Sequence, residues 1–298
     1  MVNMIRVASS EGVGIYCPEG GRFSFFNSPY PAHNAYSAID IYPESEFYST
    51  ASSPVYGKVV GIKRVHCPEK MDFETSIYDY VILMRSLENP SRWVKILHVK
   101  PTVRLGEVLK PGDNLGFMLR SGFFDFWTDP HIHVEIRDPL DPVRARGGFK
   151  IERLIMIDDS KADIGEICGR VIKSKKEYSL LLLKNNSTHG IPVRVGDNIG
   201  ILDAGIPHYG FFGIHTSTQP SLGDVIKLCN VKIGFVESIH SKMCLAKCPN
   251  LTFKLKDKPV KLSLYFNLSK PLVKVIPSKM GELKLKEFEE VSILFSYS

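Results

Sequence analysis

The stretch Asp129-Pro-His-Ile-His-Val-Glu-Ile136 concentrates side chains that can do chemistry. In a β-strand alternate side chains share a face, so His131, His133 and Glu135 would point one way and the apolar residues between them the other. Two imidazoles and a carboxylate on one face are costly to bury without a partner. A metal ion is such a partner, because neutral imidazole is a good zinc ligand. Taken alone, a His-x-His strand is a weak signal, since structural histidine pairs also occur.

Zinc needs further ligands from elsewhere in the chain, and His33 and Asp40 are the candidates. Asp40 alternates with Ile39 and Ile41, so its carboxylate faces away from the apolar side of an expected strand. Together with His133 they would supply two imidazoles and one carboxylate. A zinc ion with three such ligands and an open fourth position is catalytic rather than structural.

The elements that must position these residues are expected to be strands. Short apolar runs separated by Gly, Pro, Asn and Asp recur along the chain, at 54–60, 80–84, 93–99, 114–119 and 131–136, and again at 167–172, 178–183, 198–202, 224–228 and 231–236. This spacing is typical of all-β domains. The one helix that the pattern favours lies at 282–290.

The chain also indicates two domains. Residues 138–148 carry two Pro, two Gly and two Arg and contain no apolar run, which is typical of a linker or domain edge. A faint repeat supports this: Gly57-Lys-Val-Val60 and Pro111-Gly-Asp-Asn-Leu-Gly116 have counterparts in Gly169-Arg-Val-Ile172 and Val195-Gly-Asp-Asn-Ile-Gly200. A duplicated β unit would explain the match, and so would two β domains that reuse common Gly-Asp turns.

In their order, these motifs resemble the lysostaphin-type (LytM-like) zinc endopeptidases. Five separated positions carry the resemblance over residues 30–140, under half of the chain. The matching text is His33 to Ile41, Pro54-Val-Tyr-Gly-Lys-Val-Val60, Ile96-Leu-His98, Val108-Leu-Lys-Pro-Gly-Asp-Asn-Leu-Gly116 and Pro130-His-Ile-His-Val-Glu-Ile136. Two departures stand out. His33 and Asp40 are seven apart, where many members have a shorter gap, and the aromatic loop Ser121–Asp129 replaces a Gly-rich approach.

The resemblance implies a mainly β fold with a LytM-like β-sheet/barrel-sandwich hybrid domain at 28–148. An N-terminal extension would occupy 1–27, and a second β-rich domain, interpretable as a degenerate repeat, would occupy 149–298. By position, His33, Asp40 and His133 would hold one catalytic Zn²⁺. His98 and His131 would be the non-ligand histidines at the reaction centre. Glu135 is a candidate to orient a ligand histidine, and a solvated edge carboxylate is the alternative.

The function implied is that of a zinc metalloendopeptidase, a hydrolase that cleaves peptides containing Gly or D-amino acids. The first alternative is a LytM-like module that binds zinc and a partner without catalysis. The second is a structural β-protein with unrelated histidines.

Composition and net charge limit the other kinds of protein that this chain could be. Hydrophobic residues make up 44% and charged residues 23% of 298, close to globular averages, so a proper core can form. The net charge of +6 comes without a dense Lys/Arg block, so no nucleic-acid partner is expected. The sequence has neither a signal-peptide pattern nor an apolar run long enough to span a membrane. A cytoplasmic location without membrane insertion is therefore expected, and nothing indicates the oligomeric state.

Two further groups are weaker candidates. Cys244 and Cys248 lie four apart with Cys229 upstream, where a second zinc site is an option, although free thiols are favoured. Asp203, His208 and His215 are another option, although core or surface histidines are favoured.

Overall fold

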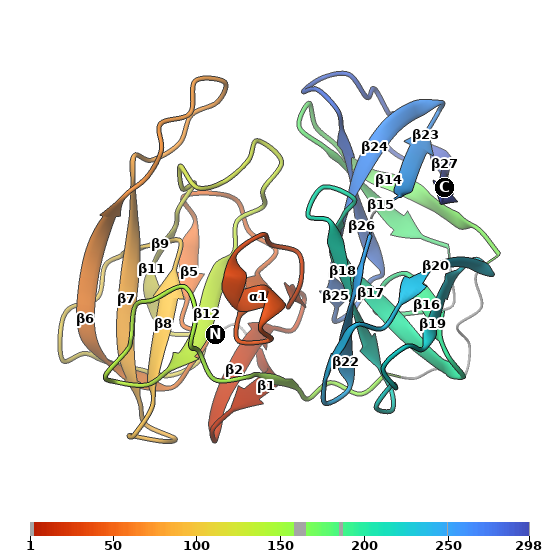
Figure 1. The fold of residues 1–298 in the computed structure, drawn as a ribbon. Helices are drawn as coiled ribbons and strands as arrows, with labels where there is room; N and C mark the ends of the chain where they lie inside the picture. The colour runs from red at the N-terminus through yellow and green to blue at the C-terminus, as the bar shows by residue number, and fades with distance from the viewer. Residues whose placement is uncertain (1–2, 158–164, 185–186, 249, 298) are drawn as a thin grey trace. The chain divides into compact units, whose positions relative to one another are not determined.

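The computed structural model describes residues 3–157, 165–184, 187–248 and 250–297. Strands dominate these residues, and the one α-helix among them is α1, Pro31–Asn34 (Figure 1), so the prediction of a mainly β fold is confirmed. No helix in the described ranges is long and apolar enough to cross a membrane. The chain forms two compact units: unit 1 comprises Met1–Phe23 and Tyr30–Ile155, and unit 2 comprises Ser24–Pro29 and Met156–Ser298.

Unit 1 holds the predicted site residues. Its strands are β1 (Met4–Ser10), β2 (Val13–Pro18), β3 (Arg22–Ser24, whose last residue falls in unit 2), β4 (Ile39–Tyr42), β5 (Thr50–Ser52), β6 (Gly57–His66), β7 (Tyr78–Ser86), β8 (Trp93–Leu97), β9 (Val99–Pro101), β10 (Val108–Leu109), β11 (Asn114–Met118), β12 (Ile132–Arg137) and β13 (Glu152–Arg153). The long sheet runs β10-β6-β7-β8-β12-β4-β3, and smaller sheets run β13-β1-β2 and β5-β11-β9.

Strand β12 lies between β4 and β8, and this placement builds the site. Both pairings are antiparallel, with His133 opposite Asp40 on β4 and opposite Leu97 on β8. Ile132, Val134 and Ile136 are buried, as the alternation predicts. Each such side chain contributes roughly 1.5 to 3 kcal/mol by burial. The polar side chains of β12 are buried too, so both faces of this strand lie inside unit 1.

Unit 2 is built around a closed ring of strands. Its strands are β14 (Ile167–Ser174), β15 (Ser179–Leu183), β16 (Pro192–Val195), β17 (Asn198–Ile206), β18 (Phe211–Thr216), β19 (Val225–Leu228), β20 (Val231–Phe235), β21 (Ser238–His240), β22 (Met243–Lys247), β23 (Leu251–Leu255), β24 (Lys258–Leu264), β25 (Phe266–Asn267), β26 (Leu272–Pro277) and β27 (Glu290–Tyr297). The ring runs β14-β15-β26-β24-β23-β27 and returns to β14. Its alternating apolar residues share one hydrophobic core.

The helix predicted at 282–290 is wrong. The segment is irregular and leads into β27, and its buried residues Leu283 and Leu285 alternate with exposed lysines. A period of two places apolar side chains on one side of an extended chain, not on one face of a helix. Here the fit to the core of unit 2 outweighs the helix propensity of Glu, Lys and Leu.

The two Gly-Asp turns of the faint repeat have different surroundings. Gly196-Asp197 closes the hairpin between β16 and β17, with Val195 opposite Asn198. Gly112-Asp113 instead precedes β11, which pairs with β5 and β9. Both glycines have positive φ, 55° and 94°, which a turn of this kind requires. Shared turn chemistry accounts for this part of the match, and a duplication stays a prediction.

Candidate metal centre

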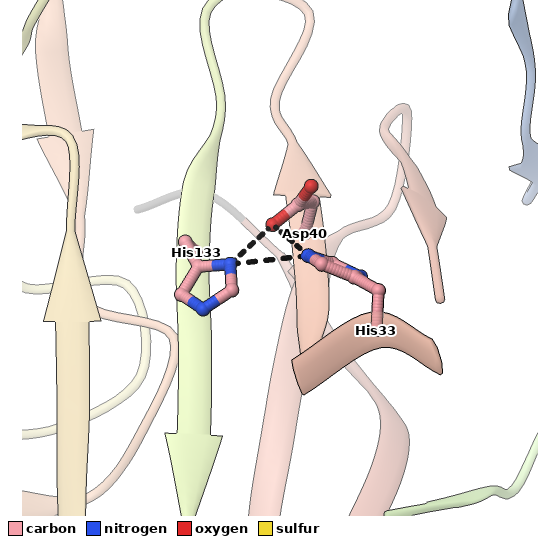
Figure 2. A group of neighbouring side chains, drawn as sticks. All are labelled: His33, Asp40 and His133. Atoms are coloured by element: carbon pink, nitrogen blue, oxygen red, sulfur yellow. Dashed lines mark hydrogen bonds and ion pairs between the residues drawn. The ribbon is translucent and has the colours of Figure 1, made fainter. Parts of the chain in front are cut away.

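Three ligand atoms converge in unit 1 (Figure 2). His33 lies on α1, Asp40 on β4 and His133 on β12, and their side chains point toward one another. His33 Nε2 is 3.3 Å from His133 Nδ1 and 3.4 Å from Asp40 Oδ1. His133 Nδ1 is 2.8 Å from the same Asp40 oxygen. Among the described residues these three form a group that could hold a metal ion.

The spacing of these atoms fits a small tetrahedral cation. Zinc–nitrogen and zinc–oxygen bonds of about 2.0 to 2.1 Å place neighbouring ligand atoms of a tetrahedron about 3.3 Å apart. The two distances from His33 Nε2, 3.3 and 3.4 Å, match this edge, and the His133–Asp40 distance of 2.8 Å is a direct hydrogen bond. The donor set and its geometry therefore fit zinc.

Burial and neighbouring charges shift the pKa values of two members of this group. Burial would lower the pKa of His133, but hydrogen bonds to Asp40 and Glu135 raise it to about 9. Burial would likewise raise the pKa of Asp40, but the charge of His33 and neighbouring histidines holds it well below its usual range. The metal-free group thus carries a proton on His133 beside an ionised Asp40. A cation bound there would take the place of that proton.

Local structure explains why these three residues meet. Asp40 and His133 are direct cross-strand neighbours, so the register of β4 and β12 fixes their spacing. His33 reaches them from the single turn of α1, which begins at Pro31 and ends at Asn34. The wide His33–Asp40 spacing is taken up by the end of this helical turn and by the turn at residues 35–38 that leads into β4, and neither was predicted from the sequence.

Glu135 holds the far side of His133. Its Oε1 atom lies 3.1 Å from His133 Nε2 and accepts a hydrogen bond from Lys95 Nζ at 2.7 Å. Its Oε2 accepts one from Arg137 Nη1 at 3.1 Å. Burial would raise the pKa of Glu135, but the hydrogen bonds and charges of His133 and Lys95 lower it to about 2. Glu135 is fully buried, so the alternative of a solvated edge carboxylate is wrong.

His98 follows β8 and is held by a buried carboxylate. Its ring Nδ1 lies 2.5 Å from Asp79 Oδ2, and its backbone N–H donates to Asp79 Oδ1. Burial would raise the pKa of Asp79, but the charge of His98 and hydrogen bonds lower it to about 2. His98 has φ of 69°, a left-handed conformation that costs a non-glycine residue roughly 1 to 3 kcal/mol. Such strain is characteristic of functional positions.

His131 precedes β12 and lies beside both His98 and the ligand group. Its ring centroid is 4.9 Å from that of His98, and its Nε2 is 3.9 Å from Asp40 Oδ2. Its Nδ1 hydrogen-bonds to the backbone carbonyl of Asp129 at 2.9 Å. Burial lowers the pKa of His131 to about 4, so its imidazole is neutral at pH 7.

The aromatic loop Ser121–Asp129 covers the two non-ligand histidines. Phe124 stacks on His131 with centroids 4.8 Å apart and meets His98 edge-on at 4.6 Å. Phe124 itself is only 5% exposed. The five histidine and aspartate residues predicted from the motifs therefore lie in one neighbourhood, and Phe124 contacts two of them, His98 and His131.

Sequence reasoning missed three buried charged residues at this site. Asp79 is on β7, Lys95 on β8 and Arg137 on β12, and each is at most 3% exposed. One signal was available: Lys95 stands within the apolar run Trp93–Val99, where a charge needs a partner across the sheet. Naming that partner requires the pairing of β8 with β12, which places Lys95 opposite Glu135.

The two weaker candidate groups belong to unit 2, whereas the three ligand candidates belong to unit 1. Cys244 and Cys248 are buried free thiols, and burial raises their pKa to about 12 and about 11. Neither they nor Cys229 belong to a metal-ligand group found within the described ranges. His215 does meet Asp203, with Nε2 and Oδ2 2.9 Å apart, in the core of unit 2.

Comparisons with known proteins add little to this geometry. A family model described as the N-terminal domain of a domain of unknown function (DUF8155) matches residues 16–153. No curated protein matches the chain. Among solved structures, the NMR solution structure of lysostaphin is similar at 11% identity and a TM-score of 0.30, with 87% of this chain and 88% of that chain covered. The antimicrobial peptidase lysostaphin from Staphylococcus simulans is similar at 10% identity and a TM-score of 0.25, with coverage of 93% and 96%.

Proposed function

We propose that this chain is a zinc-dependent metalloendopeptidase with one Zn²⁺ held by His33, Asp40 and His133. The observation that carries the proposal is the convergence of these three ligand atoms, at distances that suit zinc, beside two further imidazoles. Two imidazoles and a carboxylate leave a fourth position for solvent or substrate. The order of motifs from His33 to Glu135, which resembles the LytM-like peptidases, supports the same assignment.

A zinc ion bound there would supply Lewis-acid chemistry, polarising a scissile carbonyl and lowering the pKa of water toward about 7. The chain's own residues would manage the protons. A carbonyl oxygen only accepts, so His131 donates its Nδ1 proton to Asp129. The neutral ring then has its lone pair on Nε2, on the side of Asp40. In our proposal His131 is therefore the general base.

His98 would act on the opposite side of the reaction. The ionised Asp79 can only accept, so the Nδ1 of His98 donates to it. With Nδ1 bonded to Asp79, Nε2 is the ring nitrogen left to face a substrate, and it is a donor in the protonated ring. In our proposal this donor stabilises the negative oxygen that forms on the substrate carbonyl. The proposed substrate is a peptide that contains Gly or D-amino acids. The proposed location is the cytoplasm.

Purified full-length protein is expected to contain about one zinc per chain and to hydrolyse a Gly-rich or D-amino-acid peptide. Metal content would be measured by elemental analysis and cleavage by mass spectrometry of the products. A chelator should abolish cleavage, and added Zn²⁺ should restore it. A protein that binds no zinc at neutral pH contradicts the proposal.

One observation favours a second candidate, a zinc-binding module without catalysis. All three ligand candidates are at most 2% exposed, and Phe124 covers His98 and His131. Such a site suits a metal that stabilises a binding surface. Stoichiometric zinc without cleavage of any Gly-rich or D-amino-acid peptide would support this second candidate over the first.

Replacing Asp79 by Asn is expected to lower kcat by about 10² to 10⁴-fold with the zinc content unchanged. The amide removes the negative charge and offers a donor to the Nδ1 of His98, which turns the ring to the wrong tautomer. Steady-state kinetics and elemental analysis of the same preparation would check this. Replacing the exposed Asp113 by Asn is the matched control, and equal activities of the two variants would contradict the role of Asp79.

A further inference from the structure

Residues 24–29 belong to unit 2, although the chain just before and just after them belongs to unit 1. The chain before them ends in β3, and the chain after them enters α1, which carries His33. Both of those elements belong to unit 1 except for the last residue of β3, whereas Ser24–Pro29 are part of unit 2. The segment that leads to a candidate metal ligand is therefore packed in the C-terminal half of the chain.

A single buried carboxylate holds this segment. Asp203 is 0% exposed; its Oδ1 accepts a hydrogen bond from Ser24 Oγ at 2.5 Å and its Oδ2 accepts one from the Phe25 backbone N–H at 2.6 Å. His215 Nε2 lies 2.9 Å from the same Oδ2. Ser24 Oγ in turn accepts from the backbone N–H groups of Phe26 and Asn27. Asp203 and Ser24 thus fix the conformation of four consecutive residues.

Packing adds to this anchor. Phe25 and Phe26 are fully buried, and their ring centroids lie 5.5 and 5.7 Å from that of His215. Gly213 on β18 makes room for Phe26, because a Cβ atom at position 213 would lie 1.9 Å from Cδ2 of that ring. Even an alanine at 213 would therefore displace Phe26. Strand β18 has the shape needed to receive this segment.

The helix that follows has little stability of its own. α1 spans four residues, and its N-cap residue Tyr30 makes no side-chain capping hydrogen bond. Isolated helices this short are unstable in water, so the position of α1 depends on the packing of its buried residues Ala32 and His33 and on the chain at both ends. Tyr30 is held in unit 1, because its Oη accepts a hydrogen bond from Lys95 Nζ at 2.9 Å. At its C-terminal end Ser37 donates two hydrogen bonds to the carbonyl of Ala32, from its backbone N–H and its Oγ. At the other end, His33 follows the anchored Asn27 by only six residues.

We propose that Asp203 and Ser24 are positioning residues for the metal ligand His33, and that unit 2 serves the metal centre through this anchored segment. The inference rests on the proposed function, because it takes His33 as a zinc ligand. It gives the C-terminal half of the chain a role in metal binding, although none of the three ligand candidates lies in it.

The test compares full-length variants that release the anchor with one that weakens unit 2 elsewhere. Asp203→Asn removes the charge and one acceptor, Ser24→Ala removes the hydroxyl, and Gly213→Ala displaces Phe26. Leu262→Ala is the matched control, because Leu262 is fully buried in the core of unit 2. Among the described residues, its side chain makes no hydrogen bond to the segment 24–27 that Asp203 anchors. Hydrogen exchange of the peptide 30–37 reports the order of α1. Zinc affinity is measured by competition with a chelator.

The anchor variants are expected to exchange residues 30–37 at least about tenfold faster and to bind zinc at least about tenfold more weakly. The Leu262→Ala variant is expected to match the wild type in both, at equal or greater loss of global stability. Wild-type exchange in 30–37 for the anchor variants overturns the inference, and so does an equal effect of Leu262→Ala. A wild-type chain that binds no zinc refutes the proposed function and, with it, the metal role of the anchor. Faster exchange of residues 30–37 in the anchor variants would, even then, show that the anchor orders α1.

Discussion

The His131→Ala variant is expected to lose catalysis, with kcat lower by about 10² to 10⁴-fold, and to keep one zinc per chain. His131 is outside the group of three ligand candidates, although its Nε2 lies 3.9 Å from Asp40. Its Nδ1 proton is committed to the carbonyl of Asp129, which leaves Nε2 as the acceptor. Removal of this ring would take away the base without removing a metal donor. Steady-state kinetics and elemental analysis on the same preparation measure both quantities.

His66→Ala is the control, because His66 is an exposed histidine on β6 and lies outside the site. It should match the wild type in both measurements. Loss of zinc together with activity in His131→Ala would reverse the ligand assignment within the His-x-His pair. Full activity without the ring would remove His131 from the chemistry.

Glu135→Gln is expected to lower the free energy of unfolding by about 3 to 5 kcal/mol and to weaken zinc binding by about 10- to 100-fold. The amide leaves Lys95 and Arg137, both buried, without their shared counter-charge. It also alters the hydrogen bond that holds the Nε2 of His133. Urea unfolding of the metal-free protein and chelator competition of the holoprotein measure the two effects separately.

The pH dependence of stability gives a second measurement on Glu135. Its pKa is lowered to about 2 in the folded chain from an ordinary value of 4.5. The unfolded chain therefore binds the proton first, and the stabilisation present above pH 4.5 is lost as the pH falls toward 2. The Gln variant lacks this part of the acid sensitivity, so its unfolding free energy should fall less steeply over that range.

A double variant separates stability from metal binding. Lys95→Met in the Glu135→Gln background removes the buried cation that has lost its carboxylate partner, so part of the stability should return. Arg137 keeps its ion pair with Asp141 in both backgrounds. Zinc affinity should stay low, because His133 still lacks its carboxylate partner. If zinc affinity recovers together with stability, the effect on the metal came from general unfolding and not from the orientation of His133.

The β architecture was predictable because short alternating runs leave few other options. The run from Ile132 to Ile136 buries its apolar residues as expected. The gathering of His33, Asp40, His98, His131 and His133 followed from the order of motifs, and the structure does bring them together. Their roles in catalysis and zinc binding stay predictions.

Other parts of the site depend on pairing that a sequence does not display. Asp79 and Lys95 each stand in a strand whose neighbours are known only after the sheet is assembled in the order β7-β8-β12. The turn of α1 is too short to give a periodic pattern. The passage of residues 24–29 into unit 2 depends on Asp203, which lies 179 positions after Ser24.

Asp40 and His133 occupy one rung of the β4–β12 ladder, although 93 positions separate them in the chain. Insertions and deletions in the loops between them leave their spacing untouched. A slip of one residue in either strand would instead turn one donor to the opposite face of the sheet. The spacing of two of the three donors therefore does not depend on loop length. A change in sequence leaves this spacing intact as long as β4 and β12 keep their pairing.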